Sequence, residues 1–180
     1  MASGATVHRA ELELADIDRG VYGSHTLTLA RHPSETEERL MLRLLAWAMF
    51  ADPALEFGRG ISTDEDPDLW LRRQDGTVAL WMEVGLPEEK RLRRAAGRAD
   101  EIVVIACGGR AVAPWWARQG AGISRIPRLR VLEIPQEQSR ALAGLCSRGM
   151  RLHCTVQDGQ VMLGDDAQTV LVTPECLHPH

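Results

Sequence analysis

The sequence has no long hydrophobic run and no apolar segment near its first residue. Residues 1–16 read MASGATVHRAELELAD and lack the apolar stretch of a secretory signal. The longest apolar stretch, from Leu40 to Phe50, contains Arg43 and is too short to cross a bilayer. These absences argue against a membrane protein, and we expect the chain to be cytoplasmic.

Cysteine is scarce and has no metal-binding spacing. The four cysteines stand at positions 107, 146, 154 and 176, and no two of them form a CxxC pair. Cys176 with His178 and His180 is a conceivable zinc site, but paired ligand motifs, which mark such sites, are missing. We expect free, mostly buried thiols in a reducing compartment.

The chain also lacks internal repeats, low-complexity tracts and linkers. Its 180 residues are 44% hydrophobic and 26% charged, which is typical of a soluble globular protein. We therefore expect one domain over residues 1–180. No Ser/His/Asp arrangement of a hydrolase is present, and His25 and His32 have no partner at catalytic spacing.

The net charge of −4 conceals two segments of opposite sign. Residues 52–90 hold ten acids and four bases, whereas residues 91–130 hold nine arginines and two acids. This order suits a metal site beside a track for a polyanion. Two solvent-facing surfaces that partly neutralise each other are the alternative. Asp64 and Asp66 of the acidic loop are either additional metal ligands or solubilising charges.

Hydrophobic periodicity predicts a mixed α/β fold. The expected elements are an N-terminal β-hairpin, a helix from Ser34 to about Phe50, a hairpin around Asp75-Gly76, a second helix beginning at Pro87, a buried parallel strand over 101–107, a helix around 111–118, a strand over 129–134, a helix over 135–146 and a closing hairpin over 151–163. This order predicts a three-layer mixed β-sheet with β-hairpins added at both ends. The core spans about 34–134, the N-terminal hairpin 5–31, and the C-terminal helix and hairpin 135–173.

The hairpin around Asp75-Gly76 predicts which residues face each other. If these two residues form the whole loop, opposed residue numbers sum to 151, so that Trp70 faces Trp81 and Asp68 faces Glu83. Opposed Cβ atoms lie roughly 4.5–5.5 Å apart. Two carboxylates that close repel each other unless a proton or a cation lies between them. The register therefore predicts a divalent-metal site, with pairing to an arginine such as Arg91 or Arg94 as the structural alternative.

A third acid comes from the first helix. Glu37 lies three residues before Leu40 and seven before Leu44, so we expect it on the same inward face. Glu37 also completes a capping box with Ser34. A ligand role at the metal site and a purely capping role both remain open.

Four segments of the chain carry a resemblance that covers nearly its whole length. They read RHPSETEERLMLRLLAWA, STDEDPDLW, LWMEVGLPEEKRLRRAAGRA and TVQDGQV. Together they resemble the bacterial YaeQ family. The resemblance implies a variant of the restriction-endonuclease-like fold of the PD-(D/E)XK nuclease superfamily. Pro67-Asp68 then matches the PD element and Glu83-Val84-Gly85 the (D/E)XK element, with glycine in place of the lysine.

The resemblance implies a metal-dependent nuclease with an atypical site. Asp68 and Glu83 would hold Mg²⁺ or Mn²⁺, Glu37 would be a further acid, and Lys90 is the nearest replacement for the missing lysine. The phase of the second helix, however, places Lys90 opposite the buried stripe that contains Leu92, which fits a solvated lysine.

The alternative is a non-catalytic module of the same fold that binds nucleic acid or protein, with a link to transcription. In either case nucleic acid is the expected partner, bound through Arg91, Arg94 and Arg98. We expect no membrane association and a monomer or weak dimer.

Overall fold

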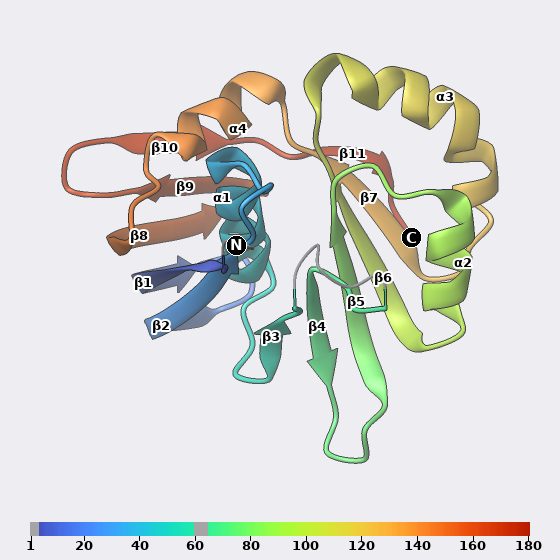
Figure 1. Ribbon diagram of the computed structural model, residues 1–180, viewed down its shortest axis with the longest axis horizontal. Helices are drawn as coiled ribbons and strands as arrows, with labels where there is room; N and C mark the ends of the chain where they lie inside the picture. The colour runs from blue at the N-terminus through green and yellow to red at the C-terminus, as the bar shows by residue number, and fades with distance from the viewer. Residues whose placement is uncertain (1–3, 60–64) are drawn as a thin grey trace.

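A computed structural model describes residues 4–59 and 65–180, which form two mixed β-sheets and four α-helices (Figure 1). The helices are α1 (Glu37–Met49), α2 (Glu89–Ala96), α3 (Val112–Ile123) and α4 (Gln136–Ala143), with a 3₁₀ turn η2 (Gly109–Ala111) before α3. The strands are β1 (Thr6–Asp16), β2 (Val21–Arg31), β3 (Leu55–Phe57), β4 (Leu69–Arg72), β5 (Val78–Val84), β6 (Ala99–Ala106), β7 (Leu129–Glu133), β8 (Gly149–Gln157), β9 (Gln160–Gly164), β10 (Thr169–Val172) and β11 (Glu175–His178). None of the described helices combines the length and apolar character that a bilayer crossing requires.

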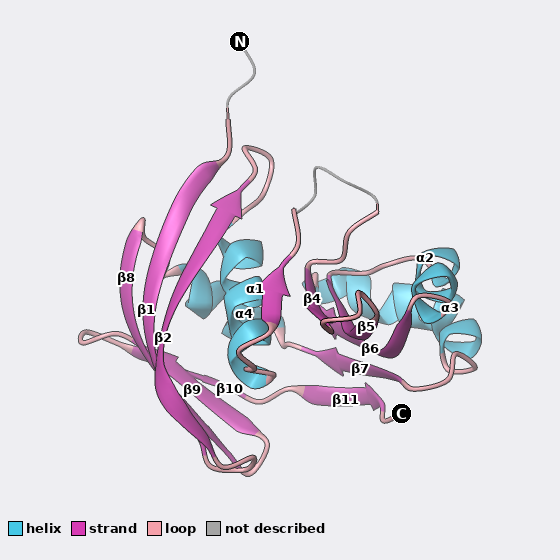
Figure 2. Ribbon diagram, turned by 90° about the horizontal axis from the view of Figure 1, so that it is seen from below, coloured by secondary structure: helices cyan, strands magenta, loops and turns pink. Residues whose placement is uncertain are grey.

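The six-stranded sheet has the order β11-β7-β6-β5-β4-β3 and lies between two pairs of helices. Helices α1 and α4 cover one face, and α2 and α3 cover the other (Figure 2). Strands β5, β6 and β7 are parallel, whereas β3, β4 and β11 pair antiparallel with their neighbours. The predicted three-layer mixed α/β arrangement is therefore confirmed.

The two terminal hairpins join into a single second sheet, which the sequence analysis did not predict. Its order is β10-β9-β8-β1-β2, and the junction is a parallel pairing of β1 with β8 in which Leu12 lies beside Leu152. The inward face of this sheet packs on α1 and α4 (Figure 2). Helix α1 therefore lies between two sheets.

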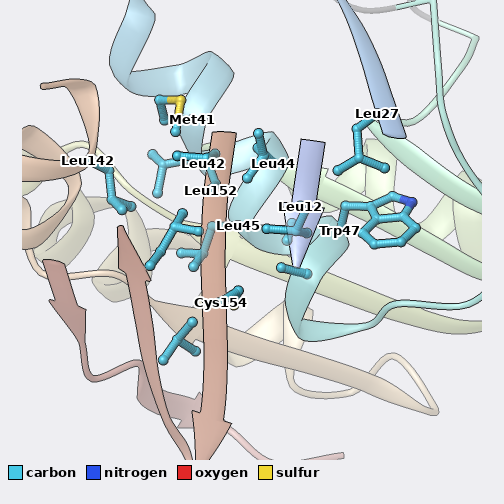
Figure 3. Close-up of a cluster of buried hydrophobic side chains, with 14 of the residues drawn as sticks. Leu12, Leu27, Met41, Leu42, Leu44, Leu45, Trp47, Leu142, Leu152 and Cys154 are labelled. Carbon is cyan, nitrogen blue, oxygen red and sulfur yellow. The ribbon is translucent and has the colours of Figure 1, made fainter. Parts of the chain in front are cut away.

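The main hydrophobic core surrounds α1 (Figure 3). Every residue from Leu40 to Ala48 is buried, so the helix has no solvent-facing side along this stretch. A helix that is apolar all round is expected to be covered on all sides, and here the two sheets and α4 cover it. A second core lies under α2 and α3, where Trp81, Trp115 and Ile102 are buried.

The starts of two helices differ from the prediction. Thr36, not Ser34, caps α1, and its hydroxyl oxygen accepts the Arg39 N–H at 3.1 Å. The capping box of Ser34 and Glu37 is therefore wrong. Helix α2 begins at Glu89 with Glu88 as its N-cap, so Pro87 lies before the helix and not at its first position.

The register of the β4–β5 hairpin is confirmed, although its loop is longer than predicted. Trp70 pairs with Trp81, and their rings pack edge to face with centroids 6.1 Å apart. Arg73 N–H, however, donates to the Thr77 carbonyl, and Arg72 pairs with Val78. The loop thus includes one additional residue, and an irregularity in the ladder restores the predicted register toward Asp68.

Candidate functional site

Asp68 lies immediately before β4 and is buried, with a relative exposure of 5%. Its Oδ1 accepts a hydrogen bond from Arg39 Nη2 at 2.6 Å. Its Oδ2 accepts the backbone N–H of Val84 at 2.7 Å. Both oxygens of this carboxylate are therefore bonded to donors within the protein, one of them positively charged.

Glu83 lies in β5 and is also buried, with a relative exposure of 6%. Its Oε1 accepts from Trp81 Nε1 at 2.8 Å and from Arg91 Nε at 2.7 Å. Burial raises the pKa of the Glu83 carboxyl, and the negative charge of Asp68 raises it further. The hydrogen bonds from Trp81 and Arg91 offset part of this rise. The two predicted site acids therefore lie close enough to influence each other.

The two acids are paired from opposite faces of the six-stranded sheet. Arg39 comes from α1 on one face, and Arg91 comes from α2 on the other. Arg91 also donates to the backbone carbonyl of Asp66 at 2.9 Å. The sequence analysis gave Arg91 or Arg94 as the alternative partner of Asp68, and this choice was wrong, because the ion pair of Asp68 is with Arg39. Arg91 pairs with Glu83 instead.

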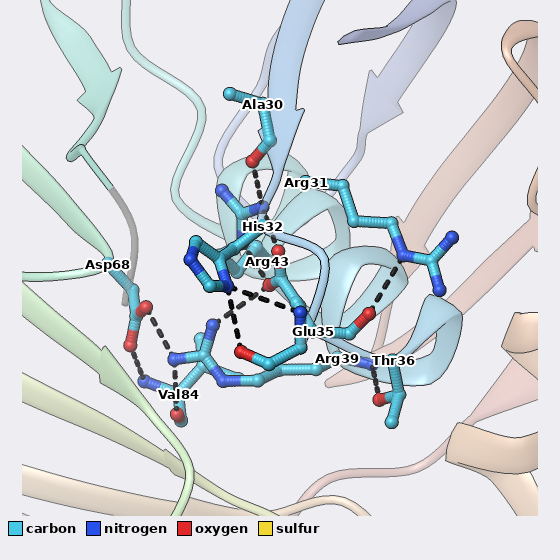
Figure 4. A network of polar contacts seen from close by, with 10 residues as sticks. Ala30, Arg31, His32, Glu35, Thr36, Arg39, Arg43, Asp68 and Val84 are labelled. Atoms are coloured by element: carbon cyan, nitrogen blue, oxygen red, sulfur yellow. Dashed lines mark hydrogen bonds and ion pairs between the residues drawn. The ribbon is translucent and has the colours of Figure 1, made fainter. Parts of the chain in front are cut away.

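Arg39 belongs to a larger buried network at the start of α1 (Figure 4). Its Nη1 donates to Glu35 Oε1 at 2.9 Å. Glu35 is 4% exposed, and its two oxygens also accept from Nε and Nη2 of Arg43, each at 2.8 Å. Arg43 Nη2 additionally donates to the Ala30 carbonyl. The chain of contacts from Arg43 through Glu35 and Arg39 to Asp68 links α1 to the hairpin.

Glu37 does not lie on the inward face of α1, so this placement was wrong. Its side chain is half exposed and lies 4.0 Å from Arg31. The prediction failed because every residue from Leu40 to Ala48 is buried, so α1 has no single inward face, and Glu37 at its first position lies beyond the covered stretch. The buried acid of this segment is Glu35, two residues earlier and outside the helix.

Lys90, the only lysine of the chain, is exposed on α2, as its helical phase predicted. Among the described residues it has no hydrogen bond or ion pair with Asp68 or Glu83. The neighbouring Arg91 takes the position beside Glu83. Gly85, at the position of the expected lysine, has a φ of +130°, which a lysine would rarely adopt.

The arrangement does not fit a divalent metal held between Asp68 and Glu83. A metal needs unprotonated oxygens directed at a shared point, whereas Asp68 Oδ1 and Glu83 Oε1 each accept from a guanidinium group, and these two groups come from opposite faces of the sheet. Within the described residues, no group of three or more His, Cys, Asp or Glu side chains is arranged to hold a metal. Asp66 is paired with Arg59 at 2.7 Å, and Asp64 lies outside the described residues.

Cys107 lies at the same end of the sheet and is not an activated nucleophile. Burial raises the pKa of its thiol to about 11, and the positive charge of Arg39 lowers it only partly. A thiol with this pKa stays protonated at neutral pH, whereas nucleophilic cysteines are thiolates. The polar residues here therefore form ion pairs, with no sign of an activated nucleophile.

The arginines of α2 gather beside Trp81. Arg91, Arg94 and Arg98 border a shallow cavity of about 140 Å³ together with Trp81. Arg98 stacks on the Trp81 ring at 5.0 Å and donates to the Glu65 carbonyl, while Arg94 is exposed. The three arginines predicted to contact nucleic acid thus share one surface, which we call the α2 arginine surface.

Sequence reasoning missed Glu35, Arg39 and Arg43, although one signal was present. Arg43 interrupts the apolar stretch from Leu40 to Phe50 and is itself only 1% exposed. A charge that deep must be paired, so an acid nearby in sequence was to be expected. Position alone did not indicate whether Glu35, Glu37 or Glu38 is that acid, because the helix start decides it.

Comparisons with family models and with known proteins identify the same family. The model of the family described as YaeQ protein matches residues 1–174. The uncharacterized protein YaeQ of Escherichia coli (strain K12) is 40% identical over 172 residues, which is 96% of this chain and 95% of the relative. The YaeQ protein of Salmonella typhi, likewise described as uncharacterized, is 41% identical over 165 residues, or 92% of this chain and 91% of its own.

Two crystal structures superpose closely on the fold. The YaeQ protein from Xanthomonas axonopodis pv. citri has a TM-score of 0.95 and 49% identity, covering 98% of this chain and 99% of that chain. The YaeQ protein from Pseudomonas syringae has a TM-score of 0.92 and 35% identity, covering 98% and 97%. This chain belongs to the YaeQ family.

Proposed function

We propose that this chain is a non-catalytic, cytoplasmic nucleic-acid-binding module built on a restriction-endonuclease-like fold of PD-(D/E)XK type. The proposal combines the three-layer arrangement around the six-stranded sheet with the positions of Asp68 and Glu83 at the motif's acidic positions. In this reading the acid pair stabilises the fold, and the neighbouring α2 arginine surface contacts the ligand.

The observation that carries the proposal is that each acid of the pair forms an ion pair with an arginine. Each carboxylate is neutralised by its own arginine, at 2.6 Å for Asp68 and 2.7 Å for Glu83. A cation at this position would have to displace two short, charge-assisted hydrogen bonds in a buried setting, which are the strong class of such bonds. The pair thus supports a structural role for residues that the superfamily uses in catalysis.

The α2 arginine surface supplies the binding chemistry. Exposed arginines bind phosphate oxygens, and an arginine stacked on an indole adds a flat surface against which an unpaired base can stack. Arg98 stacks on Trp81 in this way, and Arg94 borders the same cavity. The observed geometry favours binding to the phosphate backbone, with no preference for a particular base sequence.

A Mg²⁺- or Mn²⁺-dependent nuclease is the second candidate. One observation favours it: the two carboxylates are close enough for the charge of Asp68 to raise the pKa of Glu83. In this alternative the acids hold the metal only after the arginines have moved away, and Lys90 and Glu37 are exposed and available.

A salt titration of nucleic-acid binding tests the proposal. Fluorescence anisotropy with labelled single- and double-stranded DNA and RNA gives the association constant at each salt concentration. We expect Arg94→Gln with Arg98→Gln to weaken binding and to lower the slope of log K against log salt by roughly 2 for duplex DNA, because each phosphate contact contributes about 0.9. The matched control is Arg9→Gln with Arg151→Gln, two exposed arginines on the five-stranded sheet.

The proposal would be contradicted if the control substitutions weakened nucleic-acid binding as much as the substitutions of Arg94 and Arg98 do. Asp68→Asn should leave binding intact if the protein stays folded. Calorimetric titration of Mn²⁺ and Mg²⁺ into wild type and Glu83→Gln separates the second candidate. Metal binding that is lost in Glu83→Gln, together with metal-dependent cleavage lost in Asp68→Asn, would establish the nuclease instead.

A further inference from the structure

A cavity lies far from the acid pair, where the two sheets approach each other at the end of α1. Its volume is about 340 Å³, and it is bordered by the β1–β2 turn, the last residues of α1, β7 and the β8–β9 turn. This volume is at the lower end of the range typical of small-molecule sites. None of the residues of the Asp68 network borders it.

The walls of this cavity are mainly apolar. Phe50 closes the end of α1, Leu132 comes from β7, and Val161 comes from β9. Strands β7 and β9 belong to different sheets, so the cavity lies between the two sheets. An apolar chamber with few polar groups is the usual lining of a small-molecule site.

The two acids at the mouth are held by contacts within the protein. Asp16 is 1% exposed, and its carboxylate accepts from Arg19 Nε at 2.7 Å and from the Arg19 backbone N–H at 3.0 Å. The carboxylate of Asp18 accepts the backbone N–H groups of Asp158 and Gly159. Neither acid forms an ion pair with the remaining cation of the cavity, Arg130.

Arg130 is the unmatched group. Its Nε is buried without a hydrogen-bond partner. Across residues 4–59 and 65–180 its guanidinium has neither an ion pair nor a hydrogen bond, and its one recorded contact is with the Phe50 ring at 5.1 Å. Because Nε is covered by protein atoms, a ligand cannot reach it. The terminal N–H groups of Arg130 are not covered in this way, so they remain open to an acceptor in the cavity.

We propose that this cavity binds a small carboxylate with a compact apolar body. The carboxylate accepts from the N–H groups at the free end of the Arg130 fork, a geometry that guanidinium and carboxylate share. The apolar body packs between Phe50, Leu132 and Val161. Arg130 is the one cation of the lining and the walls are mainly apolar, so a monoanion fits better than a multiply charged phosphate.

Calorimetry with benzoate tests the site, since benzoate has both parts of the expected ligand. Wild type should bind benzoate, and Arg130→Gln should lower the association constant by at least about tenfold, because a charge-assisted pair is lost. Arg118→Gln, an exposed arginine of α3, is the matched control and should bind like wild type. Benzamide, the neutral isostere, and inorganic phosphate should bind much more weakly than benzoate.

Circular dichroism first establishes that each variant is folded. If Arg130→Gln does not fold, Arg130→Lys takes its place, and it should bind benzoate more weakly than wild type because lysine lacks the planar fork. No binding of benzoate to wild type, equal binding of benzamide, tighter binding of phosphate, or unchanged benzoate binding in the Arg130 variant would each overturn the proposal.

Discussion

Arg39 and Asp68 form a short ion pair, with Nη2 of Arg39 2.6 Å from Oδ1 of Asp68. The same nitrogen donates to the Val84 carbonyl at 3.1 Å. One side chain therefore ties the first helix to both strands of the central hairpin. The carboxylate of Asp68 thus connects α1 to this hairpin.

Breaking this pair should destabilise the protein. Asp68→Asn leaves Arg39 without its charged partner, and we expect a loss of about 3 kcal/mol in the free energy of unfolding, at the low end for buried pairs because Arg39 is partly exposed. Arg39→Met should cost a similar amount, and the double variant should cost less than the sum. Urea unfolding of the four proteins measures the coupling.

The exposed pair of Arg151 and Glu11 is the control for that cycle. Its atoms lie 3.6 Å apart and its side chains are 86% and 56% exposed. Arg151→Met with Glu11→Gln should give a coupling below about 1 kcal/mol. Equal couplings in the two cycles would mean that the Arg39–Asp68 pair is no more than a surface contact.

Glu35 and Glu37 should differ sharply when each is replaced by glutamine. Glu35 accepts hydrogen bonds from Arg39 and Arg43, so Glu35→Gln should lower the free energy of unfolding by about 3–5 kcal/mol, as removal of one charge from a buried pair does. Glu37→Gln, on the exposed side, should change it by less than about 0.5 kcal/mol. Thermal and urea unfolding measure both. A larger effect at Glu37 would restore the inward placement that the structure contradicts.

Glu83 should make the folded state less favourable as the pH rises. Its pKa is above the ordinary value of 4.5 in the folded state, so the folded protein holds its proton more tightly than the unfolded chain does. Stability from this group is present below pH 4.5 and is lost as the pH rises through the folded pKa. Urea unfolding across this pH range gives the free energy of unfolding of wild type and of Glu83→Gln. As the pH rises, the value for wild type should fall relative to that of Glu83→Gln. A difference that stays constant, or shifts in favour of wild type, would mean that the pairing with Arg91 outweighs burial.

Local patterns predicted much of the architecture. The alternation in the terminal hairpins, the apolar run over 101–107 and the Asp75-Gly76 turn each depend on neighbours within a few residues, and the structure confirms the corresponding strands. The pairing of Trp70 with Trp81 was predicted in the same way. Short-range periodicity reports which face of an element is buried, so it needs no knowledge of the partner.

The positions of charged residues were harder to predict. Glu37 was expected inside because it shares a helix face with Leu40 and Leu44, but α1 is buried on all sides from Leu40 to Ala48, so sharing that face does not predict burial at the exposed start of the helix. The partner of Asp68 was sought among the arginines of the following helix, yet it comes from Arg39, 29 residues earlier. Ion pairs between distant segments leave no periodic signal.

The sequence by itself determined the hairpins, the buried strands β6 and β7, the helices and the register that brings Asp68 near Glu83, since these follow from local hydrogen bonding and hydrophobic spacing, but not β10 and β11. Only the tertiary structure decided that the two terminal hairpins merge through β1 and β8. It also decided that arginines from opposite faces neutralise the acid pair and that Arg130 has no acceptor within the part of the chain that the structure describes. These outcomes depend on the three-dimensional meeting of segments far apart in the chain, where desolvation makes each buried charge require a partner.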